Sequence, residues 1–282
     1  MGDASVSAVA VSHVIEIGEI PIALHCRDNS FRTILENRYL SFLTPAQIAH
    51  SQFTVELTES PTDGDPEEDL QVKMQRGRWV IRRGDFKAEW DPARGTGSIR
   101  QPSNPYSLDA ILRIVHSLIL APRGGFLVHA ASAVRNGSAF LFAGVSGAGK
   151  TTISRLAPPD VTLLTDEISY IKPDGLGYRG LGYRGLGYRA FGTPFAGELS
   201  KPGENASAPV SVLYLLEKGP ENRIEPVPRD QAIRSLLRNI LFFADDPALV
   251  NSVFQSACDF LEKVPVRKLV FAPDQRIWEM IG

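Results

Sequence analysis

The chain has 282 residues, of which 43% are hydrophobic and 22% are charged, and its formal net charge is −2 at pH 7. These values are typical of a soluble globular protein that forms one large domain or two modest ones. A net charge so close to zero argues against nucleic acid and against an anionic membrane surface as partners.

Cysteine usage and hydropathy indicate a reducing compartment. The two cysteines, Cys26 and Cys258, have neither metal-ligand spacing nor a C-x-x-C partner, so a disulfide framework is not expected. No segment approaches the ~20 apolar residues that a membrane helix needs, and the N-terminus lacks the pattern of a secretory signal. We therefore expect a cytoplasmic protein.

The first 103 residues are predicted to form a mainly β N-terminal domain. Apolar and polar residues alternate in part, which predicts strands at residues 14–20, 53–57 and 78–82. The sequence Pro102-Ser103-Asn104-Pro105 is the expected boundary, because paired prolines interrupt regular structure. Residues 104–282 would then form the second domain.

The second domain is predicted to begin with an amphipathic helix. Apolar residues recur at helical spacing over residues 108–119, and Ser107 is the expected N-cap. A strand is expected at residues 126–134. The Asn136-Gly137 dipeptide then predicts a two-residue hairpin turn into a buried strand at residues 138–143.

The most specific motif is a complete G-x-x-x-x-G-K-[ST] phosphate-binding loop, made of Gly144, Val145, Ser146, Gly147, Ala148, Gly149, Lys150 and Thr151. Its glycines let consecutive backbone N–H groups face an anion. Lys150 brings a positive charge to the outer phosphates, and Thr151 offers a hydroxyl to Mg²⁺. A strand before the loop and a helix at residues 151–156 supply the required context. We expect residues 144–151 and Thr152 to bind a nucleotide; the alternative is a glycine turn without a ligand.

An acid pair follows the loop at short range. Pro158 and Pro159 end the helix early. After a predicted strand at residues 161–164 come Asp166 and Glu167, and Asp166 lies 16 residues after Lys150. Carboxylates at such a strand end can hold Mg²⁺ or accept a proton from an attacking hydroxyl. The alternative is an ordinary acid pair at a turn.

A lone histidine interrupts the strand before the hairpin. His129 lies 21 residues before Lys150, and a histidine in such a strand is most often a satisfied core residue. The hairpin, however, would bring its strand beside the one that leads into the phosphate-binding loop. His129 is therefore a candidate to orient Asp166 or to share its proton.

Residues 175–189 are three copies of Gly-Leu-Gly-Tyr-Arg. The period is too short for a solenoid unit, and an odd period disfavours one strand with a uniform buried face. We expect a flexible glycine-rich loop; the alternative is that Arg179, Arg184 or Arg189 reaches a transferring phosphate. Among the remaining segments, strands are predicted at 169–171, 210–216 and 266–271, and helices at 231–243 and 249–261.

Three motifs together resemble a known family. His129-Ala130-Ala131, the phosphate-binding loop and Thr165-Asp166-Glu167 resemble the HPr kinase/phosphorylase family, whose core is similar to the phosphoenolpyruvate carboxykinase nucleotide domain. The chain looks most like uncharacterised bacterial HPr-kinase-like proteins, some of them encoded beside peptide-modification genes. This resemblance runs from about Ser107 to Ile281 and includes the segment 192–198.

The resemblance implies a role for each motif. Residues 144–152 would bind the phosphates of ATP and Mg²⁺, Asp166 would be the general base or a metal partner, and Glu167 would be the second acid. His129 would support Asp166, and Glu198 would be a further carboxylate on the metal side. HPr kinases are hexameric, so the resemblance also implies a homo-oligomer. The Glu-x-Arg-Gly-Leu-Gly signature of that family is incomplete here, so HPr itself is not the expected substrate.

The combined prediction is an α/β (α+β) protein with a P-loop kinase core of the HPr kinase or phosphoenolpyruvate carboxykinase type. We expect an ATP- and Mg²⁺-dependent kinase that phosphorylates a hydroxyl, with serine of a peptide or protein as the acceptor. Its catalytic residues would be Asp166, His129 and Lys150, and its metal ligands Thr151, Asp166, Glu167 and Glu198. Two alternatives stay open: a nucleotide-sensing protein without phosphoryl transfer, and a kinase for a small-molecule hydroxyl.

Overall fold

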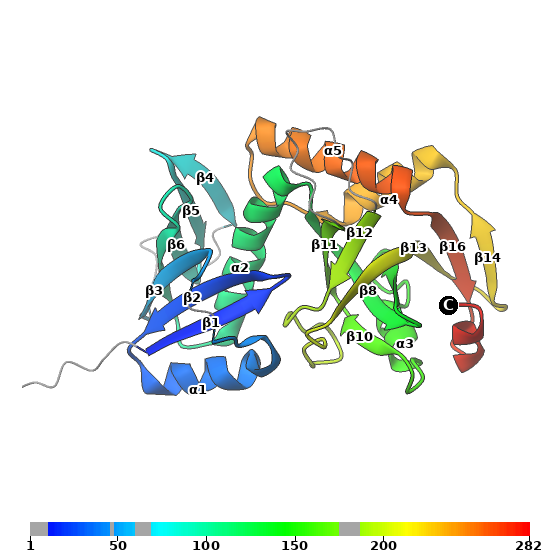
Figure 1. Ribbon diagram of the computed structural model, residues 1–282, viewed down its shortest axis with the longest axis horizontal. Coiled ribbons are helices and arrows are strands. Elements are labelled where there is room, and N and C mark those ends of the chain that lie inside the picture. The colour runs from blue at the N-terminus through cyan, green and yellow to red at the C-terminus, as the bar shows by residue number, and fades with distance from the viewer. Residues whose placement is uncertain (1–10, 46–47, 60–68, 175–186) are drawn as a thin grey trace, which may run out of the picture. The chain divides into compact units, whose positions relative to one another are not determined.

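The computed structural model describes residues 11–45, 48–59, 69–174 and 187–282. Within them the chain is mixed α/β, with two large mixed sheets and five α-helices (Figure 1). The expected mixture of helices and strands is therefore confirmed. The chain divides into two compact units, Met1–Leu112 and Arg113–Gly282. No helix in the described ranges is long and apolar enough to span a membrane.

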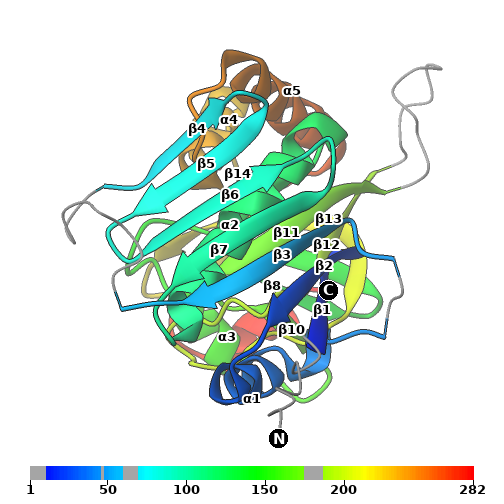
Figure 2. The same ribbon diagram turned by 90° about the vertical axis from the view of Figure 1, so that its left-hand side faces the viewer.

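The first unit is built on a seven-stranded sheet, seen in Figure 2 with its strands side by side. In sheet order the strands are β1 (Val11–Ile17), β2 (Ile20–Cys26), β3 (Ser51–Leu57), β7 (Thr96–Gln101), β6 (Phe86–Asp91), β5 (Arg78–Arg83) and β4 (Gln71–Gln75). Only the pairs β2–β3 and β3–β7 are parallel. The strands predicted at 53–57 and 78–82 correspond to β3 and β5. The strand predicted at 14–20 runs through the turn at Gly18 and Glu19, and β2, β4, β6 and β7 were not predicted.

A helix in this unit was also missed. Helix α1 (Asn29–Arg38) begins after Asp28, whose carboxylate accepts the backbone N–H of Phe31 at 2.7 Å. Phe31 and Leu35 are fully buried, as the i, i+4 spacing of a helix face requires. With only two buried anchors the apolar pattern is weak, so the capping aspartate was the better signal.

Helix α2 (Pro105–Leu120) starts earlier than the sequence indicated. The side chain of Asn104 accepts the backbone N–H groups of Tyr106 and Ser107, so Asn104 caps the helix and the N-cap assignment of Ser107 was wrong. The Ser107 hydroxyl instead donates to Asp85 at 2.7 Å. The division between the two units falls within this helix.

The second unit is built on a nine-stranded sheet. Its main path runs β10 (Thr162–Thr165), β8 (Phe126–Arg135), β11 (Ile168–Asp174), β12 (Gly187–Phe191), β13 (Ser207–Lys218), β16 (Val266–Phe271) and β14 (Arg223–Pro226). Strand β9 (Ser138–Ala143) pairs with β8 and β13, and the short β15 (Ile240–Leu241) pairs with β8. The predicted hairpin is confirmed, because Asn136 and Gly137 have φ values of 50° and 74° between paired β8 and β9.

Both faces of this sheet are buried, which explains the continuous apolar runs of β8 and β9. Helices α4 (Arg229–Asn239) and α5 (Pro247–Lys263) lie along one side and α3 (Lys150–Arg155) along the other (Figure 1). Alternate residues of β9 enter two cores: Leu141 belongs to the same core as Phe260 of α5, and Phe142 to the same core as Ile153 of α3.

The last two helices differ from their predicted bounds for local reasons. Helix α4 ends at Asn239 rather than Phe243, because Ile240 leaves it to pair with Val128 of β8. Helix α5 begins at Pro247, since Asp246 caps it by accepting the N–H of Leu249 at 2.9 Å. Its Pro sits in the first turn, where a missing N–H has no cost.

The connection between β12 and β13 is held against β10 by close backbone contacts. The N–H groups of Thr193 and Glu204 donate to the carbonyls of Leu164 and Leu163 at 3.1 and 2.9 Å. A Cβ on Gly203 would lie 1.6 Å from the Leu164 carbonyl oxygen. Only glycine permits this approach, so this position fixes the path of the connection.

We predict that Gly203→Ala lowers the free energy of unfolding by at least about 2 kcal/mol, because the added methyl group displaces buried backbone. Chemical denaturation followed by circular dichroism measures the change. Gly187→Ala is the matched control, since its Cβ would meet nothing within 4 Å. Equal stability of the two variants would contradict the packing argument.

Candidate functional site

The phosphate-binding loop lies at the carboxyl ends of three neighbouring parallel strands. Strand β9 leads into it, β13 runs parallel to β9, and β16 runs parallel to β13. Open sheets bind ligands outside the carboxyl ends of such strands. The strand–loop–helix context is confirmed, and α3 is as short as the two prolines predicted, because it ends at Arg155.

Each of the three glycines of the loop is needed for its own structural reason. Gly147 and Gly149 have φ values of 77° and 111°, which favour glycine. A Cβ on Gly149 would also lie 2.4 Å from the ring of Phe271, at the end of β16. A Cβ on Gly144 would lie 2.6 Å from the Cβ of Ala148. The loop therefore has little room for any side chain except on its open face.

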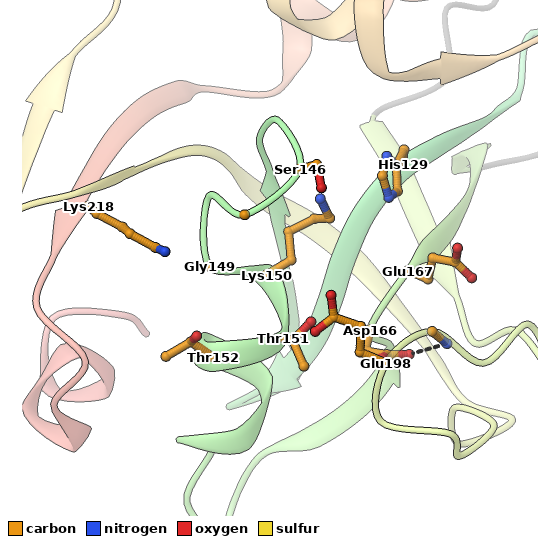
Figure 3. A pocket seen from close by; sticks show the side chains of 12 residues that line it. His129, Ser146, Gly149, Lys150, Thr151, Thr152, Asp166, Glu167, Glu198 and Lys218 are labelled. Carbon is orange, nitrogen blue, oxygen red and sulfur yellow. Dashed lines mark hydrogen bonds between the residues drawn. The ribbon is translucent and has the colours of Figure 1, made fainter.

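The loop borders a cavity of about 290 Å³, here called the loop pocket (Figure 3). Ten of the residues singled out from the sequence line it: His129, Ser146, Gly147, Gly149, Lys150, Thr151, Thr152, Asp166, Glu167 and Glu198. Of the other loop residues, Val145 is exposed and Ala148 is buried away from the cavity. The volume is at the lower end of the range for ligand pockets, ~300–1,000 Å³.

Lys150 folds back over the loop. Its ammonium donates to the Gly144 carbonyl at 3.1 Å. Burial lowers the pKa of Lys150, while Glu167 and Glu198 act in the opposite direction. A bound anion would add to the effect of these carboxylates, so the site favours a negatively charged ligand next to Lys150.

Among the described residues, Asp166 is held by backbone N–H groups and not by a side chain. Its Oδ1 accepts the N–H of Gly197 and its Oδ2 the N–H of Leu199, both at 2.9 Å. A Cβ on Gly197 would lie 2.8 Å from Oδ2, so the contact requires glycine. We call residues 197–199 the strap. This contact explains the glycine at position 197 of the 192–198 segment.

The approach of Asp166 to the pocket depends on an irregularity in β10. The register of β10 with β8 shifts between Leu163 and Thr165, which leaves Leu164 as an extra residue. Such bulges commonly re-aim a side chain beside a functional site. The Thr165 hydroxyl oxygen then accepts the N–H groups of Glu167 and Ile168 and so stabilises the turn that carries the acids.

The second acid has a partner that the sequence did not reveal. Glu167 pairs with Arg113 of α2 at 3.0 Å, and its carboxylate points away from Lys150 in Figure 3. The Arg113 guanidinium also lies 5.0 Å from the ring centre of Phe195, which is fully buried. Arg113 occupies an ordinary polar position on an amphipathic helix, so no motif marked it.

His129 lines the pocket but does not hold Asp166. It pairs in register with Ile168 across β8 and β11. Among the described residues no hydrogen bond joins His129 to Asp166, whose orientation is set by the strap. Burial lowers the pKa of His129, and the positive charges of Lys150 and Arg113 lower it further. The imidazole is therefore neutral near pH 7.

Lys218 is a second lysine in the loop pocket that the sequence analysis missed. It is the last residue of β13 and lines the cavity with the loop residues. In Figure 3 it lies on the opposite side of the loop from His129. It has no ion pair within the described part of the chain, and a lone lysine at a strand end carries no sequence signature. Two lysines thus face the same cavity.

The donors in the pocket suit a magnesium ion only if a ligand brings further oxygens. In the described ranges no three His, Cys, Asp or Glu side chains are grouped so that they could hold a metal. Mg²⁺ is usually bound by one or two carboxylates together with substrate phosphates and water. The Thr151 hydroxyl, Asp166 and Glu198 offer oxygens of that kind, whereas the Glu167 carboxylate is paired with Arg113.

The repeat contributes no described residue to the pocket. Arg179 and Arg184 lie outside the described residues. Arg189 belongs to β12 and pairs with Asp174 of β11 at 3.3 Å. In this structure Arg189 does not line the loop pocket.

A family model described as SynChlorMet cassette protein ScmC matches residues 106–282. The chain belongs to the ScmC family. This corrects the expected family, because the model that matches is ScmC and not an HPr kinase family. No curated protein matches the chain. The residues that line the loop pocket of this ScmC chain all lie within the matched range.

We predict that His129 titrates below the ordinary histidine value of about 6.5 and that Lys150→Gln moves its pKa part of the way back. The shift stays incomplete because burial, the larger cause, is unchanged. NMR titration of the imidazole resonances measures this. Lys218→Gln, which removes an equal charge, is the control and should change the pKa less.

The lowered pKa of His129 also makes the folding stability depend on pH. The unfolded chain binds a proton at His129 more readily than the folded chain, so stability falls as the pH drops below about 6.5. His129→Gln should therefore lose less stability than the wild type between pH 7 and pH 5. A steeper loss in the variant would contradict the depressed pKa.

Proposed function

We propose that this protein is an ATP- and Mg²⁺-dependent phosphotransferase that transfers the γ-phosphoryl group to a hydroxyl. The observation that carries the proposal is the joint presence, in one small cavity, of a complete phosphate-binding loop and a positioned carboxylate, Asp166. A loop alone would support nucleotide binding only. A carboxylate held beside it supports proton transfer as well.

The loop would bind the phosphates of ATP. Its backbone N–H groups would cradle them, Lys150 would leave the Gly144 carbonyl to contact the outer phosphates, and Lys218 would add a second charge. Catalysis of phosphoryl transfer is mostly positioning and charge stabilisation. Two lysines in a cavity of this size fit that requirement.

Asp166 would accept the proton of the attacking hydroxyl. An ionised carboxylate has about four lone-pair positions, and the strap uses one on each oxygen. Asp166 therefore keeps free acceptor positions while its orientation is fixed. His129 is neutral near pH 7 and adds no charge that would compete for the carboxylate.

The reaction would proceed by direct displacement. The hydroxyl oxygen forms a bond to the γ-phosphorus, and the bond from that phosphorus to the bridging oxygen breaks. The electron pair of the broken bond leaves with ADP, and the hydroxyl proton passes to Asp166. Thr151 and Glu198 are the residues that would hold Mg²⁺, which when bound neutralises charge on the phosphates, and Asp166 would stay available as the base.

We predict that Asp166→Asn reduces the rate of phosphoryl transfer by about 10²–10⁴-fold, the usual contribution of a general base, while ATP affinity changes little. Lys150→Ala should instead weaken ATP binding. Transfer is measured with radiolabelled ATP, and affinity by calorimetry. Asp246→Asn is the matched control, because it retains the N-cap of α5 outside the pocket.

The rival function is nucleotide sensing without transfer. It gains support if the wild type binds Mg-ATP but labels no hydroxyl acceptor among peptides, proteins and small alcohols. Unchanged transfer by Asp166→Asn would remove the catalytic role of this residue.

A further inference from the structure

A second cavity shares Asp166 with the loop pocket. Its volume is about 530 Å³, and it is bordered by β10 and its preceding turn on one side and by residues 199–206 on the other. No loop residue and neither pocket lysine lines it. Of the described residues, Asp166 is the only one that lines both this cavity and the loop pocket.

The strap contributes residues to both cavities. Gly197 and Glu198 line the loop pocket, and Leu199 lines the second cavity. The two backbone N–H groups that hold Asp166 come from the strap. A group that enters the second cavity therefore meets the same carboxylate that borders the loop pocket.

We propose that the second cavity binds a segment of peptide chain and presents its hydroxyl to Asp166. The proposal rests on the phosphotransferase function given above and adds where the acceptor binds and what class it belongs to. Phosphoryl transfer needs the attacking and leaving oxygens roughly in line. The nucleotide would occupy the loop pocket and the acceptor hydroxyl would come from the second cavity, and both cavities border the proposed base, Asp166.

The walls of the cavity suit a peptide better than a sugar or another polyol. Apolar side chains make up nearly half of the lining: Val161, Leu163, Leu199, Pro202 and Ala206. A polyol site would need mainly hydrogen-bonding groups, whereas a peptide combines apolar side chains with polar amides. The volume falls well within the range of ligand pockets, ~300–1,000 Å³.

The charges at the cavity do not favour a strongly charged acceptor. Lys201 and Glu204 are exposed at its border and carry opposite signs. The outer edge of β10 is not free at Leu163, whose carbonyl accepts the N–H of Glu204 at 2.9 Å. The segment would therefore enter a side-chain pocket and would not extend the sheet as an added strand.

The test uses two variants that fill the cavity from its exposed border, Thr162→Trp and Lys201→Trp. Both side chains line the second cavity and neither lines the loop pocket. The probes are radiolabelled Mg-ATP with a degenerate library of serine- and threonine-containing peptides, and a parallel panel of glycerol and simple sugars. Thr54→Trp on β3 is the control, an exposed strand threonine of the first unit. Cooperative thermal unfolding checks that each variant folds.

We expect each cavity variant to lower kcat/KM for the peptides at least tenfold with KM for ATP within twofold, and Thr54→Trp to match the wild type. Peptide labelling that both cavity variants leave unchanged would overturn the binding site but not the phosphotransferase. Labelling confined to glycerol or sugars would overturn the peptide class. If the wild type neither binds ATP nor labels any probe, the phosphotransferase proposal fails, and the acceptor site fails with it.

Discussion

The site depends on the two hydrogen bonds that hold the Asp166 carboxylate. Asp166 is only 6% exposed, and a buried carboxylate is costly unless donors satisfy it. Gly197 and Leu199 provide those donors from the backbone, so the carboxylate is fixed without a second ionisable group. Because the donors belong to the chain itself, the position of Asp166 follows the path of the strap.

That path is in turn set by the sheet. The connection that carries the strap is bonded to the carbonyls of Leu163 and Leu164 on β10, and β10 ends one residue before Asp166. The phosphate-binding loop is set by the same sheet, because Gly149 contacts Phe271 at the end of β16. One rigid framework thus fixes both the loop and the carboxylate, which is what positioning at the level of an ångström requires.

The sequence predicted those features that depend on a few neighbouring residues. The hairpin at Asn136-Gly137 and the loop at residues 144–151 are local signals, and the structure has both. It did not reveal the partners that hold the acids, because Gly197 lies 31 residues from Asp166 and Arg113 lies 54 residues from Glu167. The expected family was wrong because families that differ in fold or function can share the same phosphate-binding motif.

The strap also contributes to both cavities of the site. The chain turns at Glu198 and Leu199, where the N–H of Ser200 donates to the Gly197 carbonyl at 3.0 Å, and these two turn residues line different cavities. The backbone between these two side chains is the backbone that holds Asp166. One short turn thus contributes a wall residue to each cavity and both hydrogen bonds to the carboxylate that the cavities share.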